Sequence, residues 1–232
     1  MSSVMQWKSI NIANGVASVT QLEGYDILPV RPDLSQATGE RFTRNGTLLE
    51  SVTGPREFDD HAGVPLPTRS FLWSCPDRAA CELLRAFLDA RHGRVVPFWA
   101  PTFNHDLEMV QDGSSNIRWI WVRRAGYVEK VYPLPGRNRI AIFPPGGEMF
   151  LRPVLAAFQF DATTDTVLFD PVLRTTGGPI FPLPKGSTCV SFLTLCRLAE
   201  DMTKITWFSN TSCQASLQFI ELPHEVPPVA SY

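Results

Sequence analysis

Residues 69–110 constrain the fold most, because they carry the one long amphipathic helical pattern that the chain contains. Apolar residues recur there at three- and four-residue spacing, which predicts a helix over about residues 76–92 with a single apolar stripe. Ser74 is its expected N-cap, and Gly93 is the expected left-handed stop after it. Prolines at 97 and 101 then require an extended segment. A lone helix in a chain of this length leaves strands to build most of the fold.

Hairpin signals occupy the rest of the sequence. Each consists of two alternating apolar stretches separated by Asn-Gly, Gly-Gly or Asp-containing turns. The predicted hairpins cover residues 42–49, 106–122, 139–152, 156–169 and 204–221, with further strands at 128–132 and 188–198.

Hairpins at short spacing predict a mainly β fold, an antiparallel β-sandwich or split barrel with one flanking α-helix. The helix-bearing part ends near Pro133–Asn138, where the hairpin-only part begins. The predicted domains are therefore 1–135, a β-sandwich with the helix, and 136–232, a second small β domain or sheet extension. The 20 prolines are spread through the chain, so they punctuate turns and edge strands and mark no linker.

Charge argues against a general nucleic-acid binder. Only 19% of the residues are charged and the net charge is −2, without a basic stripe. The N-terminus lacks the pattern of a signal peptide, and no apolar stretch reaches the length of a membrane helix. We expect synthesis in the cytoplasm and no insertion into a membrane.

Metal and disulfide chemistry are not indicated by the cysteines. The chain has five, an odd number, widely spaced and without a C-x-x-C pair. Small buried thiols are the expected role, in preference to a disulfide framework or a metal site. The cysteines are Cys75, Cys81, Cys189, Cys196 and Cys213.

Enzymatic motifs are missing as well: there is no Gly-x-Ser-x-Gly, phosphate loop or Gly-x-Gly-x-x-Gly. The triplets 59–61 and 104–106, which contain His61 and His105, could join into a metal or acid–base site. Neighbours in a strand point to opposite faces, so each triplet offers at most two ligands. His92 is expected to play a structural role at the helix end, and the fourth histidine is His224. We therefore predict no enzyme, with no catalytic, cofactor-binding or metal residues.

Two of the six tryptophans form the most conspicuous binding candidate. Trp119 and Trp121 are two residues apart and share one face of their strand. Packing in the core or against another subunit is favoured for this pair, because exposed paired indoles are costly unless covered. A sugar-binding aromatic platform is the alternative. The other tryptophans are Trp7, Trp73, Trp99 and Trp207.

Two parts of the chain resemble tail-tip proteins of long-tailed bacteriophages. Phe87–Pro101, followed by Asp106–Met109, is similar to a segment in which a short helix ends in an Arg-x-Gly stop and leads into a Pro-Phe-Trp strand. Phe192–Asp201, Ile205–Trp207 and Glu221–Pro223 are similar to the end of the same proteins. Together these stretches cover about a third of the chain, and the motifs are structural, without a catalytic residue.

The resemblance implies a distal tail or baseplate protein of the tail-tube-like family, which stacks as hexameric rings around a DNA channel. It implies a structural protein of the virion tail tip that connects tail tube to baseplate or receptor-binding apparatus. The implied partners are further copies of the chain, the tail-tube protein, and baseplate hub or tail-fibre proteins, with DNA only passing through the lumen. The alternative function is a carbohydrate-binding accessory module of the same particle, and a cell-wall hydrolase comes third.

Overall fold

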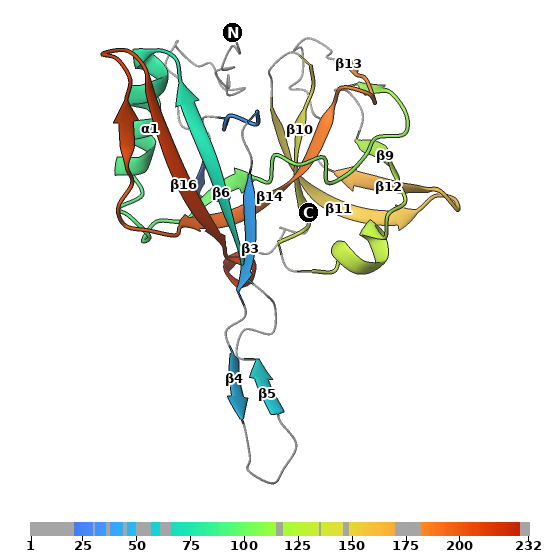
Figure 1. Cartoon of the computed structure of the whole chain (residues 1–232). Coiled ribbons are helices and arrows are strands. Elements are labelled where there is room, and N and C mark those ends of the chain that lie inside the picture. The colour runs from blue at the N-terminus through green and yellow to red at the C-terminus, as the bar shows by residue number, and fades with distance from the viewer. Residues whose placement is uncertain are drawn as a thin grey trace. The chain divides into compact units, whose positions relative to one another are not determined.

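The computed structural model describes residues 21–29, 31–35, 38–43, 46–49, 57–60, 66–114, 118–134, 136–145, 149–169 and 182–227. Over these residues the protein is mainly β, with a single α-helix, α1 (Arg78–Asp89), among its strands (Figure 1). The predicted fold class, antiparallel sheets with one flanking helix, is confirmed. Trp7, His61 and the predicted strands before residue 21 lie outside the described residues.

The strands are β1 (Gln21–Leu22), β2 (Tyr25–Ile27), β3 (Gly39–Thr43), β4 (Gly46–Leu49), β5 (Glu57–Asp60), β6 (Leu66–Cys75), β7 (Phe98–Pro101), β8 (Gly113–Ser114), β9 (Trp119–Arg123), β10 (Arg139–Phe143), β11 (Phe150–Gln159), β12 (Thr164–Phe169), β13 (Pro182–Leu183), β14 (Cys189–Leu198), β15 (Ile205–Trp207) and β16 (Cys213–Glu221). A π-helical turn, η1 (Tyr127–Val131), and a 3₁₀ turn, η2 (Pro223–Glu225), complete the described elements.

Contacts within the chain define two compact units. The barrel unit takes the described residues of Met1–Arg31, Phe98–Leu195 and Pro223–Tyr232. The helix unit takes those of Pro32–Pro97 and Cys196–Leu222. Both units are discontinuous in sequence, unlike the predicted segments 1–135 and 136–232. The physical reason is long-range pairing, since β16 returns near the end of the chain to pair with β6.

The barrel unit is built on the antiparallel order β14–β10–β11–β12–β9. The segment after β7 joins the two ends of this order, because Leu107 bridges Val190 of β14 and Met109 bridges Val122 of β9. Two backbone hydrogen bonds reinforce the junction, from the N–H of Leu107 to Val190 at 3.1 Å and from Val110 to Trp121 at 3.0 Å. The predicted strand at 106–110 thus forms two bridges, and its predicted pairing with the strand at 117–122 is present.

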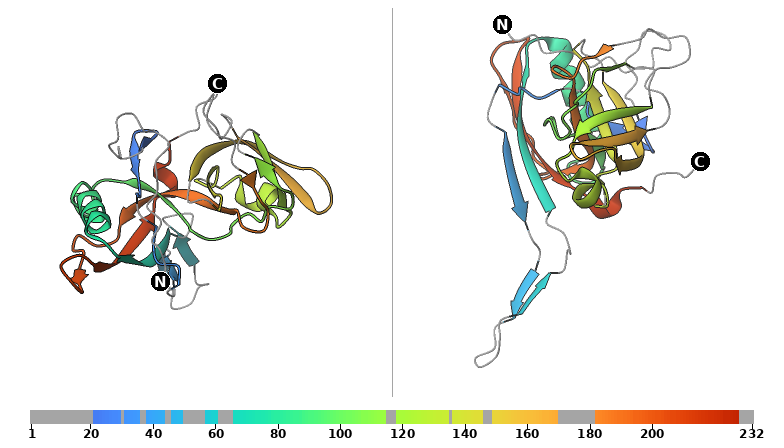
Figure 2. Two further views of the ribbon diagram at one scale, coloured as in Figure 1. Left: turned by 90° about the horizontal axis from the view of Figure 1, so that it is seen from above. Right: turned by 90° about the vertical axis from the view of Figure 1, so that its right-hand side faces the viewer.

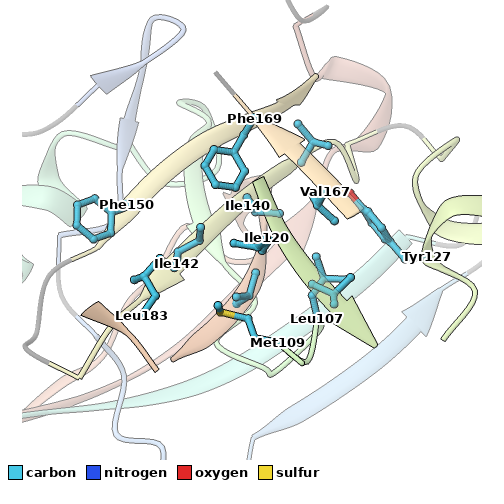
Figure 3. Packing of buried hydrophobic residues seen from close by; sticks show 13 residues of the cluster. Leu107, Met109, Ile120, Tyr127, Ile140, Ile142, Phe150, Val167, Phe169 and Leu183 are labelled. Atoms are coloured by element: carbon cyan, nitrogen blue, oxygen red, sulfur yellow. The ribbon is translucent and has the colours of Figure 1, made fainter. Parts of the chain in front are cut away.

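Aliphatic and aromatic side chains fill the interior of this unit (Figure 3). Inward and outward residues alternate along each strand, so every second side chain enters the core. Burial of this apolar surface is the main force that holds the strands together. The cluster consists of Leu107, Met109, Ile120, Val122, Tyr127, Ile140, Ile142, Phe150, Val154, Val167, Phe169, Leu183 and Val190.

An irregular segment separates β7 from Leu107. Phe103 adopts φ 57°, and the ladder beside β14 is interrupted. The Asp106 carboxylate replaces a backbone acceptor there, since it accepts a hydrogen bond from the N–H of Phe192 at 2.7 Å and another from the Thr102 hydroxyl. Asp106 therefore satisfies a backbone donor that would otherwise be left without an acceptor in the sheet.

The outermost strands of the barrel unit are fastened by one arginine. Strand β2 pairs in parallel with β7, and the Trp99 indole N–H donates to the carbonyl of Leu22 at 2.8 Å. Arg139 is fully buried, pairs with both Glu23 carboxylate oxygens at 2.8 and 2.9 Å, and lies 5.1 Å from the Trp99 ring centroid. Its guanidinium also donates to the carbonyl of Pro227, so the residues after η2 fold back onto this unit.

The predicted strand at 128–132 is wrong, because the chain forms η1 there. Gly126 adopts φ 85° and begins the turn, whose closing bond runs from the N–H of Tyr132 to Tyr127 at 2.8 Å. The Tyr127 ring is buried in the core, and its hydroxyl donates to the carbonyl of Arg137 at 3.1 Å. One buried aromatic ring thus outweighs the strand preference of the valines beside it.

The helix unit is organised around the long β16–β6 pair, whose register runs from Cys213↔Cys75 to Ile220↔Thr68. Strand β3 pairs with the other edge of β6, and the three strands lie side by side in Figures 1 and 2. Helix α1 packs against β6. The predicted alternation along β16 is confirmed, since the side chains of residues 213, 215, 217 and 219 are buried.

Aromatic rings and an ion pair fill the buried face of this pair. The Phe71 and Trp73 rings meet edge to face with centroids 5.8 Å apart, and Phe219 lies 5.4 Å from Trp73. At the end of the row, Arg69 pairs with Glu221 at 2.6 Å. A second carboxylate, that of Glu40, lies 3.1 Å from the same guanidinium.

Helix α1 is shorter than predicted at both ends. Its N-cap is Asp77, whose carboxylate accepts from the N–H of Ala80 at 2.8 Å; Ser74, the predicted cap, still belongs to β6. Pro76 favours an extended residue before it, so the strand continues up to this point. Gly93 has the predicted left-handed conformation, with φ 65°, and a Cβ there would lie 2.6 Å from an Asp201 carboxylate oxygen, but the helix ends before it, with Ala90 as its C-cap.

The hairpins at 139–152, 156–169 and 204–221 and the strand at 188–198 are confirmed. The predicted hairpin at 42–49 is wrong, since β3 pairs with β6 while β4 pairs with β5 in a separate two-stranded sheet. Pairing with the ten-residue strand β6 gives β3 a longer row of cross-strand contacts than pairing with β4 across the Asn-Gly turn would give. Strands β8 and β13 form a further small pair.

Candidate functional site

The candidate site is the outer face of strands β9, β12 and β11 in the barrel unit. We call it the aromatic face and define it by Trp119, Trp121, Phe158, Phe160 and Leu168. The register places Trp121 opposite Thr166 and Thr166 opposite Phe158, so these three side chains form one row across the sheet. Trp119 and Leu168 share the next row.

Alternation explains why these residues point outward. Ile120, Val122 and Val167 enter the core, so their neighbours in each strand must face the other way. The result is unusual exposure of large apolar groups: 40% for Trp119, 48% for Phe158 and 63% for Phe160. The predicted shared face of Trp119 and Trp121 is confirmed, but this face lies outside the core. Of the packing roles considered for the pair, core packing is therefore wrong.

The two indoles contact each other at right angles. Their centroids are 6.1 Å apart and their planes are inclined by 79°. An edge-to-face pair is a favourable aromatic contact, which fixes both rings on the strand. It also means that the two rings do not present parallel faces to a ligand.

Little charge accompanies this face. Arg123, at the end of β9, is held by an exposed ion pair with Glu108 at 3.0 Å. Thr166 lies between Trp121 and Phe158 and is 5% exposed; its hydroxyl has no hydrogen-bond partner among the described residues. The centre of the face therefore combines apolar rings with one buried hydroxyl and carries no charge, and charged residues are likewise depleted in the core of a protein interface.

The pKa values of two carboxylates near this sheet are shifted in opposite directions. Burial raises the pKa of Asp165, whose side chain lies on the inner side of β12. The exposed Glu129 carboxylate accepts a hydrogen bond from the Arg124 guanidinium at 2.6 Å, which lowers its pKa. The two carboxylates are close enough to interact, since Glu129 also raises the pKa of Asp165 and Arg124 opposes that shift.

The three histidines that the structure describes, His92, His105 and His224, are exposed. His105 is exposed, while Asp106 of the same triplet turns inward to the backbone of β14. His92 follows α1 with φ 48° and is exposed, and His224 is exposed in η2. The proposed joint site with residues 59–61 is not described, because His61 lies outside the described residues.

Two of the remaining tryptophans differ from the pair on the aromatic face. Trp73 and Trp99 are fully buried, one in each unit, and their roles are structural. Trp207 of the helix unit is 41% exposed, as Trp119 is, and the Arg78 guanidinium lies 5.0 Å from its ring centroid.

The five cysteines are buried and none forms a disulfide, as predicted. Three of them, Cys75, Cys81 and Cys213, come together in the helix unit. They are the one group of side chains, within the described part of the chain, whose donor atoms are placed to share a metal ion.

Sequence reasoning did not identify Phe158, Phe160 and Leu168 as members of the site. Their signal was present, because Phe158 and Phe160 share a strand face just as the tryptophans do. The register that puts the two pairs on one surface depends on long-range pairing of β9 with β12, which the spacing of residues does not reveal.

No described helix has the length and apolarity that a membrane span requires. The sequence matches no protein-family model, and no curated protein is significantly similar to it.

Proposed function

We propose that this chain is a structural protein of a phage tail tip, which assembles with copies of itself into a ring and joins the tail tube to the baseplate or receptor-binding apparatus. The aromatic face is the observation that carries the proposal. Large contiguous apolar surfaces on soluble proteins mark interaction sites, because leaving them in water costs free energy. The rigid strands beneath this face hold its side chains in place for docking.

The composition of the face favours a protein partner. Tryptophan and phenylalanine are enriched at the energetic centres of interfaces, and charged residues are depleted there. The perpendicular indoles suit insertion between side chains of a partner better than stacking under consecutive sugar rings. On the aromatic face the carbohydrate-binding alternative retains one exposed indole, that of Trp119, and no flat platform.

The occupant we propose is a second copy of the chain. In a closed ring every copy repeats the same contact, so a modest single interface gives a durable assembly. Six copies follow from the resemblance to tail-tube-like proteins. That resemblance also supports the tail-tube protein and the hub or fibre proteins as neighbours, the virion tail tip as location, and DNA passing through the lumen.

Two features of the fold are compatible with this resemblance. The stretch 87–101 forms the end of α1, a left-handed conformation at Gly93 and strand β7, in the order that the resemblance implies. The barrel and helix units together give the mainly β architecture with one helix expected of such proteins. No step of the proposal requires catalysis, a cofactor or a membrane.

The proposal is tested by mass photometry and electron microscopy of the purified full chain, alone and with the tail-tube protein of the same particle. We expect rings of the unmodified chain. The double variant Trp119→Ser/Phe158→Ser should weaken assembly at least tenfold while its melting temperature changes little. The matched control is Phe208→Ser, which removes an exposed aromatic ring from the helix unit and should leave assembly unchanged.

Three outcomes would count against the proposal. A monomer that no tail component drives into rings contradicts the structural role. Undiminished assembly of the double variant places the interface away from the aromatic face. Binding of glycans that quenches indole fluorescence and disappears in Trp119→Ser supports the carbohydrate-binding alternative.

A further inference from the structure

Three cysteine sulfurs meet inside the helix unit, although they come from separate parts of the chain. Cys75 ends β6, Cys213 begins β16 directly opposite it, and Cys81 lies in the first turns of α1. Their Sγ atoms all lie within 4.8 Å of one another. Each residue is only 2% exposed, so the cluster is closed to bulk water.

The three thiols interact with one another, because the Cys75 and Cys213 side chains hydrogen-bond to each other and each also hydrogen-bonds to Cys81. The Cys81 thiol also makes long contacts to the carbonyl of Cys75 at 3.8 Å and to that of Thr211 at 3.7 Å. A thiol is a weak hydrogen-bond donor, so these bonds hold the sulfurs together only weakly.

The spacing fits a metal ion. Three sulfurs bound to one ion at about 2.3 Å would be separated from each other by about 4 Å. The cluster needs to contract by less than about 1 Å to reach that geometry. A side-chain rotation is enough for such a change, since all three residues lie at the ends or first turns of their elements.

We propose that Cys75, Cys81 and Cys213 bind one thiophilic closed-shell metal ion, of the class of Cu(I) and Zn(II), and that this ion fastens β6, α1 and β16 together. On binding, each S–H that becomes a ligand loses its proton to solvent as a metal–sulfur bond forms. The oxidation state of the metal does not change.

Two features of the surroundings act in opposite senses on a negatively charged metal–thiolate group. Cys81 lies near the amino-terminal end of α1, where the helix dipole stabilises negative charge. Without metal, burial raises the pKa of Cys75 to about 11 and raises that of Cys213 as well, so these two thiols are protonated near neutral pH. Metal binding must therefore weaken as the pH falls, because protons compete for the same sulfurs.

Coordination number and charge distinguish the two ions. Three thiolates alone suit Cu(I), which accepts soft sulfur ligands, whereas a structural Zn(II) site has four ligands. The carbonyl of Thr211, close to Cys81, is available as a fourth donor. Zn(II) would leave less net negative charge buried than Cu(I), so the two ions are separate arms of the test.

The experiment uses the full chain, purified without oxygen in the presence of a phosphine reductant and freed of metal. Because the cluster is buried, the chain is unfolded and refolded with one equivalent of Zn(II), Cu(I) or the spectroscopic probe Cd(II). Mass spectrometry of the desalted protein then gives the metal content. We expect one ion per chain for at least one of the two natural metals, a thiolate-to-metal charge-transfer band with Cd(II), and a higher melting temperature with bound metal.

Variants separate the cluster from the other thiols. Cys81→Ser should bind at least tenfold more weakly, whereas Cys196→Ser, which removes a buried cysteine outside the cluster, should bind as the unmodified chain does. Circular dichroism checks that both variants fold. If Cys81→Ser does not fold, the ¹¹³Cd chemical shift of the unmodified chain reports the number of bound sulfurs, and fewer than three contradicts the proposal.

Two results would overturn the inference. One is that the reduced chain retains none of the three ions and that its melting temperature is unchanged by each of them. The other is equal retention by Cys81→Ser and the unmodified chain. Air oxidation that removes two mass units from a chain unable to take up metal identifies a redox disulfide in place of a metal site. The inference does not rest on ring assembly, so the two proposals fail separately.

Discussion

Two aromatic pairs, one in each unit, have the same local geometry and opposite surroundings. Phe71 and Trp73 on β6 meet edge to face at 5.8 Å and 74°, and Trp119 and Trp121 on β9 meet at 6.1 Å and 79°. Trp73 is fully buried, whereas Trp119 is 40% exposed. Each pair occupies positions i and i+2 of a strand, so alternation alone does not distinguish them.

The two pairs differ in exposure because each unit buries a different set of side chains. In the helix unit the Phe71 and Trp73 side chains on β6 are buried, and the rings contribute to folding. In the barrel unit the core is already filled by other apolar side chains, among them those on the inner face of the same strands. The outer rings then remain available for a partner. One sequence pattern thus serves stability in one unit and, we propose, recognition in the other.

The largest expected effect follows from removing the covered ring. Trp73→Ala should reduce the free energy of unfolding by about 3–5 kcal/mol, because it leaves a large cavity in the core of the helix unit. Urea denaturation followed by circular dichroism measures the change. A loss below about 1 kcal/mol would mean that the face around Trp73 is not a close-packed core, and the comparison would fail.

The ion pair at the end of the same face provides the next test. Glu221→Gln removes the buried charge that pairs with Arg69 and should cost about 2 kcal/mol, since hydrogen bonds to charged groups contribute more than neutral ones. The matched control is Glu108→Gln, whose pair with Arg123 is exposed and should contribute about 0.5 kcal/mol or less. Equal effects in thermal denaturation would show that burial does not set the difference.

Asp165 tests the inner face of the barrel unit through pH. Burial raises its pKa in the folded protein, so its ionised form opposes folding once the pH exceeds the ordinary aspartate value. Asp165→Asn should therefore stabilise the protein by about 1 kcal/mol at pH 7, and the gain should vanish as the pH falls toward 4. Melting temperatures measured between pH 4 and 7.5 give the profile.

Asp161 serves as the control for this profile, because its pKa is shifted in the opposite direction. Asp161 in the β11–β12 turn accepts hydrogen bonds from the backbone and hydroxyl of Thr163, which lower its pKa. Its ionised form supports folding above the ordinary aspartate pKa, and the support is lost as the pH falls through the lowered value. Asp161→Asn should thus lose stability at neutral pH and little in acid. Identical profiles for the two variants would contradict the assigned burial of Asp165.

The smallest effect on stability is expected on the aromatic face. Trp119→Ser should change the free energy of unfolding by about 1 kcal/mol or less, because the lost contacts are cross-strand neighbours on an exposed sheet face. Urea denaturation beside Trp73→Ala measures the contrast directly. A loss as large as that of Trp73→Ala would show that the ring is part of the core of the barrel unit.

Local sequence patterns predicted the structure correctly wherever the conformation of a segment depends on residues close in sequence. The helix, the left-handed conformation of Gly93 after it, the β10–β11 hairpin and the buried alternation along β16 follow from spacing and turn residues close in sequence. The prediction failed where a distant partner competed. Strand β3 pairs with β6 instead of closing the Asn-Gly hairpin, and the burial of Tyr127 turns residues 127–131 into a π-helical turn.

The sequence by itself determined that this protein is mainly β with one helix, that its cysteines are buried thiols, and that Trp119 and Trp121 share a face. Tertiary structure alone decided that this face is exposed, that Phe158 extends it, and that Cys75, Cys81 and Cys213 meet. The physical reason is that periodicity assigns each side chain to one side of its strand. Which side becomes covered depends on pairing between segments far apart in the chain, and that pairing brings the candidate sites together.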